Sequence, residues 1–348
     1  MKQCPSHQIL NPKTNRCVSK TGVIGKKLLM SQVVIDYKKG IIKSLTEIKN
    51  YLMQKNDYYR VKAYSNVLTQ LYTYQKPITS IEDFKANIKV GDKILAKVKE
   101  LIDTNKIKYI DTNIIKDDIY KFKEELKDIY GIGYKKTNEL IKMGITSIEL
   151  LKKNQHLLNE KQKIGLHYYE DLRKRIPLNE YEIHKDVLEI NLKSKGFIYE
   201  FVGSYRRKGT SMGDIDILMM ENNKFDLLSF VNNLKDTGYI IEILALGKHK
   251  FMGICKIGKN PARRVDILIA PKEEYFYSLL YFTGSADFNV GFRNYVKDNF
   301  NLSLSEHGIK GLGNKTAPII KSEKDIFTYF KIPYLKPEDR KVFIIPIK

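Results

Sequence analysis

The sequence predicts a multidomain α+β protein in which two helical blocks precede a mixed sheet with its own helices. Three observations predict this class. The chain has 348 residues, which is enough for several modules. Apolar residues recur at helical spacing from about residue 32 to residue 175. After Pro177 this pattern gives way to short strands that alternate with helices.

These changes of pattern divide the chain into five segments. We expect an N-terminal appendage without sustained periodicity, two helical domains, a sheet domain and a small C-terminal α/β subdomain, at residues 1–30, 31–112, 113–177, 178–272 and 273–348. Within the first helical domain the spacing predicts helices at residues 33–53, 58–72, around Ile81 and at 92–104. The second helical block spans residues 117–175 and stops at Ile176-Pro177.

The composition favours an intracellular, soluble protein that binds a polyanion. The formal net charge is +21 and the sequence pI is near 9.5, with lysine and arginine spread along the whole chain. Such a charge favours a nucleic-acid partner. An anionic membrane would also attract it, but no basic amphipathic helix, lipidation signal or long apolar run stands out. We therefore expect nucleic acid and no membrane.

Three cysteines, Cys4, Cys17 and Cys255, are too few for a disulfide framework, so we expect a reducing compartment. Cys4, His7 and Cys17 could together hold zinc, but a fourth ligand is missing and the spacing fits no standard finger. We expect no metal at these residues.

Two glycine turns lie in the helical blocks. Gly131 and Gly133 flank Ile132 and open onto a helix predicted at residues 135–143, and a degenerate copy with Gly91 opens onto residues 93–102. Glycine lets the backbone approach a DNA phosphate, and N–H groups at a helix start can contact it. One such turn could be a plain loop, but two in a basic helical protein favour DNA-binding helix-hairpin-helix motifs.

The sheet domain contains a phosphate-type turn beside paired carboxylates. Residues 197–202 predict a strand, Gly203-Ser204 a tight turn, and the following residues the first turn of a helix that would attract anions, with Ser204 and Arg207 as phosphate donors. The next strand, residues 214–220, places Asp214 and Asp216 on one face because its period is two.

A third carboxylate, Asp266, lies in another short strand at residues 264–269. Three carboxylates beside a phosphate turn are typical of a two-metal nucleotidyltransferase. The alternative is that an Asp-x-Asp pair is solvent-facing loop chemistry and the Gly-Ser turn an ordinary one.

With these motifs in their order and spacing, the chain resembles the family X DNA polymerases over residues 32–348. The resemblance implies a deoxyribose phosphate lyase-like domain with the first hairpin, a helix-hairpin-helix subdomain, a nucleotidyltransferase palm and a subdomain that binds the nascent base pair, in the order of the four segments after the appendage. The phrases that carry it are Gly131 to Gly133, Lys163 to Asp171, Arg173 to Pro177, Gly203 to Arg207, Gly213 to Asp216, Tyr281 to Ser285, Leu304 to His307 and Ser322 to Phe327.

The resemblance implies two Mg²⁺ ions, which Mn²⁺ can replace, held by Asp214, Asp216 and Asp266. Asp266 would help to activate the primer 3'-hydroxyl. It also implies Na⁺ or K⁺ at the hairpin motifs, bound through the backbone carbonyls of Lys127, Ile129 and Ile132.

The resemblance further implies a set of residues for the incoming dNTP and for DNA. The triphosphate would be bound by Arg175, Ser204, Arg207 and Gly213. The sugar pocket, which crowds a 2'-hydroxyl, would be lined by Tyr281, Phe282 and Gly284. Asn289 would contact the edge of the base. DNA contacts would come from Gly91, Gly131, Gly133, Arg264 and Arg293. Without the family, Tyr281 and Phe282 would be taken as core aromatics.

The first helical domain would hold a lyase site. Lys93 and Lys97 lie four residues apart on one helix face, and Arg60 and Tyr64 share that spacing. By position, Lys97 would form the Schiff base, and Arg60, Tyr64 and Lys93 would hold the 5'-phosphate. Neighbouring cations lower a lysine pKa, which keeps the amine neutral for attack. The alternative is that these lysines simply face water.

Several positions depart from the family pattern. Lys208 stands where the family has glycine, Ala96 where a glutamate would support the lyase, Leu268 where an arginine would pair with a catalytic aspartate, and Ala286 where an acid lies near the incoming base. We expect polymerisation to survive with altered gating and fidelity. The short stretch 257–262 favours template dependence, because template-independent relatives carry a long loop there.

The sequence thus predicts a monomeric, template-dependent DNA polymerase that fills short gaps in base excision repair. Its substrates would be gapped or nicked duplex DNA and dNTPs, and it would work beside a DNA ligase and an abasic-site endonuclease. The alternatives are a template-independent nucleotidyltransferase and a non-catalytic scaffold that grips gaps. The stretch from Ile9 to Val18 resembles a short motif of large DNA viruses. That resemblance implies a viral protein of the host cytoplasm or the virion, with the nucleus left open.

Overall fold

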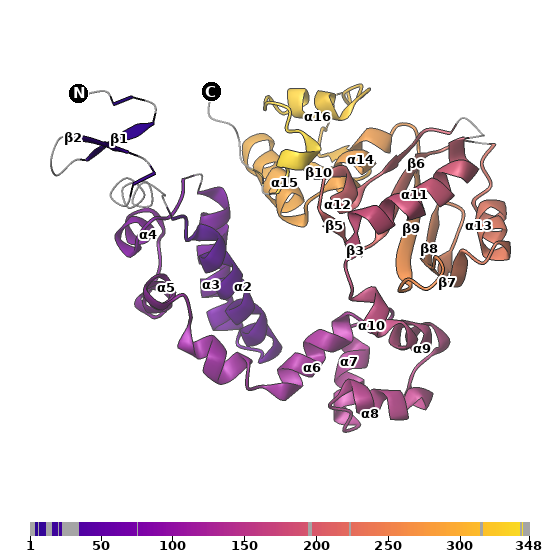
Figure 1. Ribbon diagram of the computed structural model, residues 1–348, viewed down its shortest axis with the longest axis horizontal. Coiled ribbons are helices and arrows are strands. Elements are labelled where there is room, and N and C mark those ends of the chain that lie inside the picture. Colours follow the sequence, from indigo (N-terminus) through magenta and orange to yellow (C-terminus); the bar gives the residue numbers. More distant parts are fainter. Residues whose placement is uncertain are drawn as a thin grey trace. The chain divides into compact units, whose positions relative to one another are not determined.

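The computed structural model describes residues 4–5, 7–11, 16–19, 21–22, 35–74, 76–193, 197–222, 224–313, 316–341 and 343. The chain forms two compact units, which divide between Lys121 and Phe122. Helical segments come first along the chain and the mixed sheet with its helices follows, as the sequence predicts (Figure 1). The α+β class is therefore confirmed.

The first unit is helical apart from a small N-terminal hairpin. Its helices surround one apolar core that includes Leu45, Leu71, Phe84 and Val98, each almost fully buried. The helix predicted at 33–53 begins at Lys38, with Tyr37 as its N-cap; residues 33 and 34 lie outside the described part. The helices are α2 Lys38–Gln54, α3 Tyr58–Thr73, α4 Ile81–Asn87, α5 Asp92–Thr104 and the π-helix η1 Ile110–Ile114.

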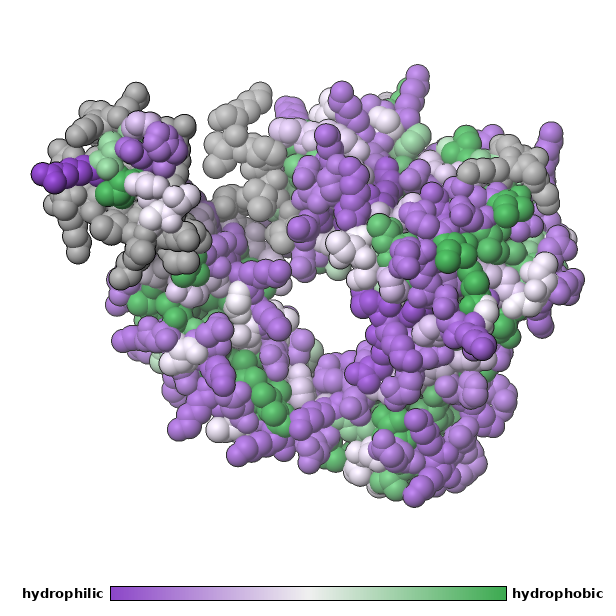
Figure 2. Space-filling view, in the orientation of Figure 1, coloured by the Kyte–Doolittle hydropathy of each residue, from purple (hydrophilic) through white to green (hydrophobic). Residues whose placement is uncertain are grey.

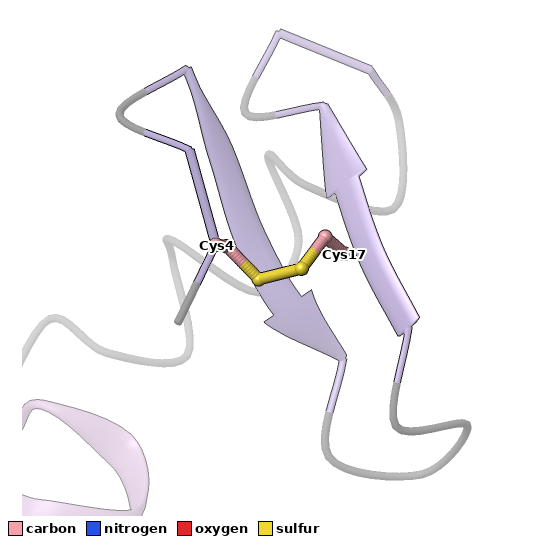
Figure 3. The surroundings of a disulfide bond; sticks show 2 residues. All are labelled: Cys4 and Cys17. Atoms are coloured by element: carbon pink, nitrogen blue, oxygen red, sulfur yellow. A yellow bond between two sulfur atoms is a disulfide. The ribbon is translucent and has the colours of Figure 1, made fainter. Parts of the chain in front are cut away.

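The N-terminal hairpin corrects one prediction from the sequence. Strands β1 (Gln8–Asn11) and β2 (Arg16–Ser19) pair antiparallel, with Leu10 opposite Cys17. Cys4 and Cys17 form a disulfide, with their Cα atoms 5.8 Å apart (Figure 3). The cysteine count indicated no disulfide framework and therefore a reducing compartment, but the hairpin returns the chain to Cys4 and allows a local pairing that a count does not reveal. The cysteines therefore no longer support a reducing compartment.

The second unit opens with a helical subdomain that packs around Phe122, Leu126, Leu140 and Tyr169. Its helices are short, and Asn159 and Gln162 form a capping box at the start of α9. The elements are α6 Asp118–Lys127, which crosses the unit boundary, α7 Tyr134–Lys142, α8 Ile148–Lys153, the 3-10 helix η2 Gln155–Leu157, α9 Glu160–His167 and α10 Tyr169–Leu172.

A five-stranded sheet of order β4-β6-β9-β8-β7 forms the centre of the second unit. Strands β6 and β9 are parallel, and the other neighbours are antiparallel. A second, two-stranded sheet pairs β3 with β5. The elements are β3 Ile176–Pro177, α11 Leu178–Lys193, β4 Tyr199–Phe201, α12 Gly203–Arg206, β5 Ser211–Met212, β6 Ile215–Met220, α13 Leu227–Asp236, β7 Ile240–Leu246, β8 Lys250–Cys255 and β9 Arg263–Ala270.

The two faces of the sheet have different cores, as the period of two requires. Ile215, Ile217 and Met219 point into a core shared with α11 and α13. Leu218 points the other way, into a smaller core with Tyr275 and Leu279 of α14. Alternate residues of β6, and therefore Asp216, lie on the α14 side of the sheet.

The C-terminal part packs its helices around a cluster of aromatic rings, in which Phe292 stacks on Phe343 with centroids 5.0 Å apart. Its elements are α14 Tyr275–Thr283, α15 Ala286–Phe300, the hairpin of β10 Ser303–Ser305 and β11 Gly308–Lys310, α16 Glu323–Tyr329 and the 3-10 helix η3 Pro337–Asp339.

The visible described surface is mainly hydrophilic, with apolar residues in scattered groups (Figure 2). Among the helices that the structure describes, none combines the length and the apolar character needed to cross a membrane.

Candidate active site

Parallel pairing brings two of the three predicted carboxylates side by side. In the register of β6 and β9, Asp216 is the direct partner of Asp266. Asp214 lies just before β6, two residues from Asp216. Burial, and then the charges of Asp214 and Asp266, raise the pKa of Asp216 well above its usual range. Burial also raises the pKa of Asp266, although the Arg264 guanidinium opposes that rise. Three acids are therefore crowded at the end of two central strands.

The guanidinium of Arg264 binds the third carboxylate, that of Asp266. Its Nε donates to Asp266 Oδ1 at 3.1 Å and its Nη2 to Oδ2 at 2.9 Å, so both carboxylate oxygens are engaged. The two residues are two apart on one strand and share a face. Carboxylate oxygens are the donors that Mg²⁺ prefers, so the residue types fit a divalent cation. However, no three acidic, histidine or cysteine side chains within the described residues converge on one ion. Asp266 would have to turn from Arg264 to join such a site.

The turn before β6 approaches the carboxylates closely. Gly203 has φ +62°, and a Cβ at this position would lie 2.5 Å from Asp216 Oδ2. Glycine is thus required both by the backbone conformation and by the contact. The helix after the turn, α12, is a single turn of four residues, shorter than the helix that the sequence suggests. Lys208 adopts φ +56°, the left-handed region where glycine is favoured.

The predicted phosphate-binding arginines are held by backbone carbonyls. Arg207 Nη1 donates to the Thr283 carbonyl, and Arg175 Nη2 donates to the Ser211 carbonyl. Burial lowers the pKa of Arg207, against the opposing charge of Asp216. Gly213 faces Arg175, because a Cβ there would lie 3.2 Å from Arg175 Nη1. The structure therefore brings Arg175, Arg207, Gly203 and Gly213 around the acids.

A buried ion-pair network that sequence reasoning missed lies behind the turn. Arg206 donates from Nη2 to Glu323 Oε2 at 2.7 Å, and Arg340 donates from Nη1 to Glu323 Oε1 at 2.7 Å. Arg206 also donates to Thr283 Oγ1 at 2.7 Å. This network links the phosphate turn to α14 and α16. No sequence spacing points to it, because its members are more than a hundred residues apart at the widest.

A cleft of ≈ 570 Å³ opens beside the acids. It is lined by residues 127–133, by Leu172, and by Gly213, Asp214 and Arg264. The glycine turn of the second hairpin thus faces the carboxylate site. Gly131 has φ +82°, and its carbonyl accepts a hydrogen bond of 2.8 Å from Gln162 Nε2. Of the carbonyls predicted to bind a monovalent cation, that of Ile129 already accepts from the Ile132 N–H at 3.1 Å.

Four family models match this chain in succession. They are a helix-hairpin-helix domain at residues 36–107, the fingers domain of DNA polymerase lambda at 124–173, the DNA polymerase beta palm at 175–272 and the DNA polymerase beta thumb at 278–341. The chain belongs to the family X DNA polymerases.

Similar proteins agree with this assignment. DNA polymerase lambda of Rattus norvegicus is 26% identical over 333 residues, which cover 89% of this chain and 57% of that protein. DNA polymerase lambda of Arabidopsis thaliana is 25% identical, covering 78% and 58% of the two chains. DNA nucleotidylexotransferase of Xenopus laevis is 25% identical, covering 76% and 60%. The chain therefore spans less than two thirds of the length of these relatives.

In this family X chain, the residues predicted for the sugar and base pocket gather at the α14–α15 junction. Asn289 Nδ2 donates to the Tyr281 carbonyl at 2.7 Å, and the Arg293 guanidinium lies 4.6 Å from the centre of the Tyr281 ring. A Cβ at Gly284, which has φ +61°, would lie 3.4 Å from Arg207 Nη1. Phe282 packs edge-on against Tyr281. Arg293 also donates to Glu306 at 3.1 Å, a partner that the sequence did not suggest.

The predicted lyase residues lie in the first unit. Lys97 Nζ is 5.3 Å from the centre of the Tyr109 ring and donates to the Lys93 carbonyl at 3.2 Å. Burial, and then the Arg60 guanidinium, lower the pKa of Lys97. Arg60 is held by Asp57, whose Oδ2 accepts from its Nε at 2.6 Å. Tyr109 interacts with both Arg60 and Lys97, but no spacing rule relates it to them.

The remaining predicted residues of the first unit differ in exposure. Tyr64 is buried in the helical core, and this burial raises its pKa to about 12. Lys93 is exposed. Gly91 precedes α5, and a Cβ there would meet nothing within 4 Å. The first hairpin thus has open space in front of its helix.

Proposed function

We propose that this chain is a template-dependent DNA polymerase that fills short gaps in base excision repair. The observation that carries the proposal is the parallel register that sets Asp216 beside Asp266, with the Gly203 turn against Asp216. A strand pair that crowds acids in this way gains nothing in stability unless cations neutralise them. A non-catalytic scaffold would not need this arrangement.

Each part of the site has a proposed task in nucleotidyl transfer. Bound Mg²⁺, or Mn²⁺ in its place, would supply Lewis-acid stabilisation of the transferred phosphoryl group when held by Asp214, Asp216 and Asp266. Arg175 and Arg207, with Ser204 and the backbone at Gly213, bind the triphosphate tail of a dNTP. Tyr281, Phe282 and Gly284 shape the sugar pocket, and Asn289 and Arg293 contact the base edges.

DNA and further partners complete the proposal. The backbone of a gapped or nicked duplex would contact the cleft beside residues 127–133 through Arg264 and the hairpin glycines. Na⁺ or K⁺ would bind the carbonyls of Lys127, Ile129 and Ile132. The first unit would add a lyase step through Lys97. An abasic-site endonuclease would act before this monomeric enzyme, and a DNA ligase would act after it. The chain would keep the five segments expected from its sequence.

We also propose a viral origin, with action in the host cytoplasm, the virion or the nucleus. The support is the motif within residues 9–18, of which residues 9–11 and 16–18 lie in the hairpin strands β1 and β2. The disulfide between Cys4 and Cys17 lies in this same segment.

The polymerase proposal predicts loss of gap filling when Asp216 is replaced. Extension of a primer across a one-nucleotide gap, with Mg²⁺ and the complementary dNTP, should fall at least about 10³-fold in Asp216→Asn, because removing a ligand forfeits several kcal/mol of transition-state stabilisation. The matched control is Asp226→Asn, which changes the N-cap of α13 to an equally good cap. Gap filling that survives in Asp216→Asn, or falls equally in both variants, would contradict the proposed site.

A template-independent nucleotidyltransferase is the second candidate, because a DNA nucleotidylexotransferase is among the similar proteins. The connection between β8, which ends at Cys255, and β9, which begins at Arg263, is short, and a short connection here favours template dependence over this second candidate. Addition of nucleotides to a single strand without template, at a rate matching gap filling, would favour this candidate over the first.

A further inference from the structure

One aromatic ring connects the hairpin turn to a catalytic carboxylate. The Arg264 guanidinium lies 5.5 Å from the centre of the Tyr130 ring. The same guanidinium holds both oxygens of Asp266, at 3.1 and 2.9 Å. Tyr130 belongs to the hairpin turn, residues 127–133, and Asp266 to the central strand β9. Arg264 therefore contacts both Tyr130 and Asp266.

The Tyr130 ring is a fixed support because its backbone is locked. A Cβ on Gly165 of α9 would lie 2.6 Å from the Tyr130 carbonyl oxygen and 2.8 Å from its nitrogen, so α9 touches this backbone directly. Gln162 of the same helix donates to the carbonyl of Gly131 at 2.8 Å. The ring packs against the apolar cluster of Leu244, Ile254 and Ala262. The cation–π attraction to such a ring favours the observed position of the guanidinium.

Arg264 as placed opposes the binding of a divalent cation to Asp266. A guanidinium bound to both oxygens supplies the positive charge that a metal would supply, and it repels a second cation. This agrees with the finding that no three acidic side chains converge within the described part of the chain. Arg264 also lines the cleft with the hairpin turn and Asp214. A phosphate entering that cleft therefore competes with Asp266 for the same guanidinium.

We propose that Tyr130 is a positioning residue that holds Arg264 over Asp266, so that Asp266 is masked from divalent cations until a DNA phosphate in the cleft draws the guanidinium away. The inference rests on the proposed function, because it takes DNA and a divalent cation as ligands of this site. DNA and metal then bind with positive coupling. By linkage, each ligand raises the affinity for the other by the same factor.

The test measures Mn²⁺ binding by electron paramagnetic resonance, with and without DNA, in the full-length protein. The DNA is a gapped duplex with a dideoxy-terminated primer, so that no primer hydroxyl can bind the metal. Tyr130→Leu keeps an apolar side chain against the cluster but removes the ring face, and Tyr130→Phe keeps the face. Without DNA, Tyr130→Leu should bind Mn²⁺ about three- to tenfold more tightly than wild type, which is the range that loss of a cation–π contact supports. Tyr130→Phe should match wild type.

With gapped DNA bound, the difference between Tyr130→Leu and wild type should vanish, because the phosphate has already removed Arg264. Equal Mn²⁺ affinity in all three proteins without DNA, or the same difference with DNA, would overturn the inference. If Tyr130→Leu unfolds below the wild-type temperature, Arg264→Gln replaces it, and unchanged Mn²⁺ affinity in Arg264→Gln has the same consequence. Gap filling by the wild-type protein separates the two proposals. If wild type fills no gap, the proposed function is contradicted. If wild type fills gaps but the Tyr130 variants bind Mn²⁺ as wild type does, only the masking of Asp266 is contradicted.

Discussion

At the scale of single residues, the surroundings of Lys97 suit the role of nucleophile that is proposed for it. Its pKa is lowered by burial and by Arg60. The sign is favourable, because a lower pKa leaves a larger neutral fraction at any pH below it, and only the neutral amine attacks an aldehyde. If Lys97 acts as proposed, it should therefore form a Schiff base at lower pH than an exposed lysine.

Replacing Arg60 by Gln should move this behaviour to higher pH. Without the neighbouring cation the pKa of Lys97 rises, so the pH midpoint of borohydride trapping on an incised abasic duplex should shift upward. Lys62→Gln is the matched control, because Lys62 lies on the same helix and is exposed. Arg60 could also help to bind DNA, so the midpoint of the profile is the measurement, and its amplitude is not. An unmoved midpoint in Arg60→Gln would refute the assignment of Arg60.

The sequence predicted which residues belong to the candidate site better than it predicted which side chains contact them. Asp214 and Asp216 followed from the period of two in a strand, and the same rule places Arg264 on the face of Asp266. The grip of Arg264 on Asp266 was therefore within reach of the sequence. Tyr109 beside Lys97, and Glu323 beside Arg206, were not, because contacts between distant segments depend on packing.

At the scale of elements, the strand-turn-helix around Gly203 depends on a backbone conformation that a side chain cannot adopt cheaply. Gly203→Ala should lower the free energy of unfolding by about 1–2 kcal/mol for the left-handed conformation alone. The added Cβ would also displace the Asp216 carboxylate, and a displacement near 1 Å costs roughly 10²-fold in rate. Thermal unfolding and single-turnover gap filling measure the two effects.

Gly238→Ala separates strain from displacement. Gly238 has φ +77°, and a Cβ there meets nothing within 4 Å. It should lose a similar stability and keep wild-type gap filling. If both variants lose activity to the same extent, displacement of the Asp216 carboxylate is not the cause of the loss in Gly203→Ala.

Element boundaries were predictable where local signals end them. Helix α5 occupies the predicted residues, because Gly91 precedes it and Asn105, with φ +57°, ends it. The helix after Gly203 stops after one turn, because Lys208 and Gly209 fold back so that the Gly209 N–H donates to the Ser204 carbonyl at 2.9 Å. The hairpin of β1 and β2 carried no periodicity long enough to predict it.

At the scale of the whole molecule, the strongest property predictable from composition is charge. A net charge of +21 is present, with basic residues in both compact units, while the family and the order of its domains follow from motif spacing. Composition alone does not say which lysines touch phosphate, because most of them project into water. Salt dependence can make that distinction, since each phosphate contact releases counterions.

Binding to a gapped duplex should therefore weaken steeply as salt rises, with a slope of log affinity against log salt of about −0.9 for each phosphate contacted. Lys93→Ala, which removes an exposed lysine from the proposed 5'-phosphate site, should reduce the slope by about one. Lys235→Ala removes an exposed lysine from the last turn of α13, outside every proposed DNA contact, and should leave the slope unchanged. Fluorescence anisotropy at four salt concentrations gives both slopes. Equal slopes for Lys93→Ala and Lys235→Ala would mean that the first unit holds DNA by its overall charge and not through a defined phosphate site.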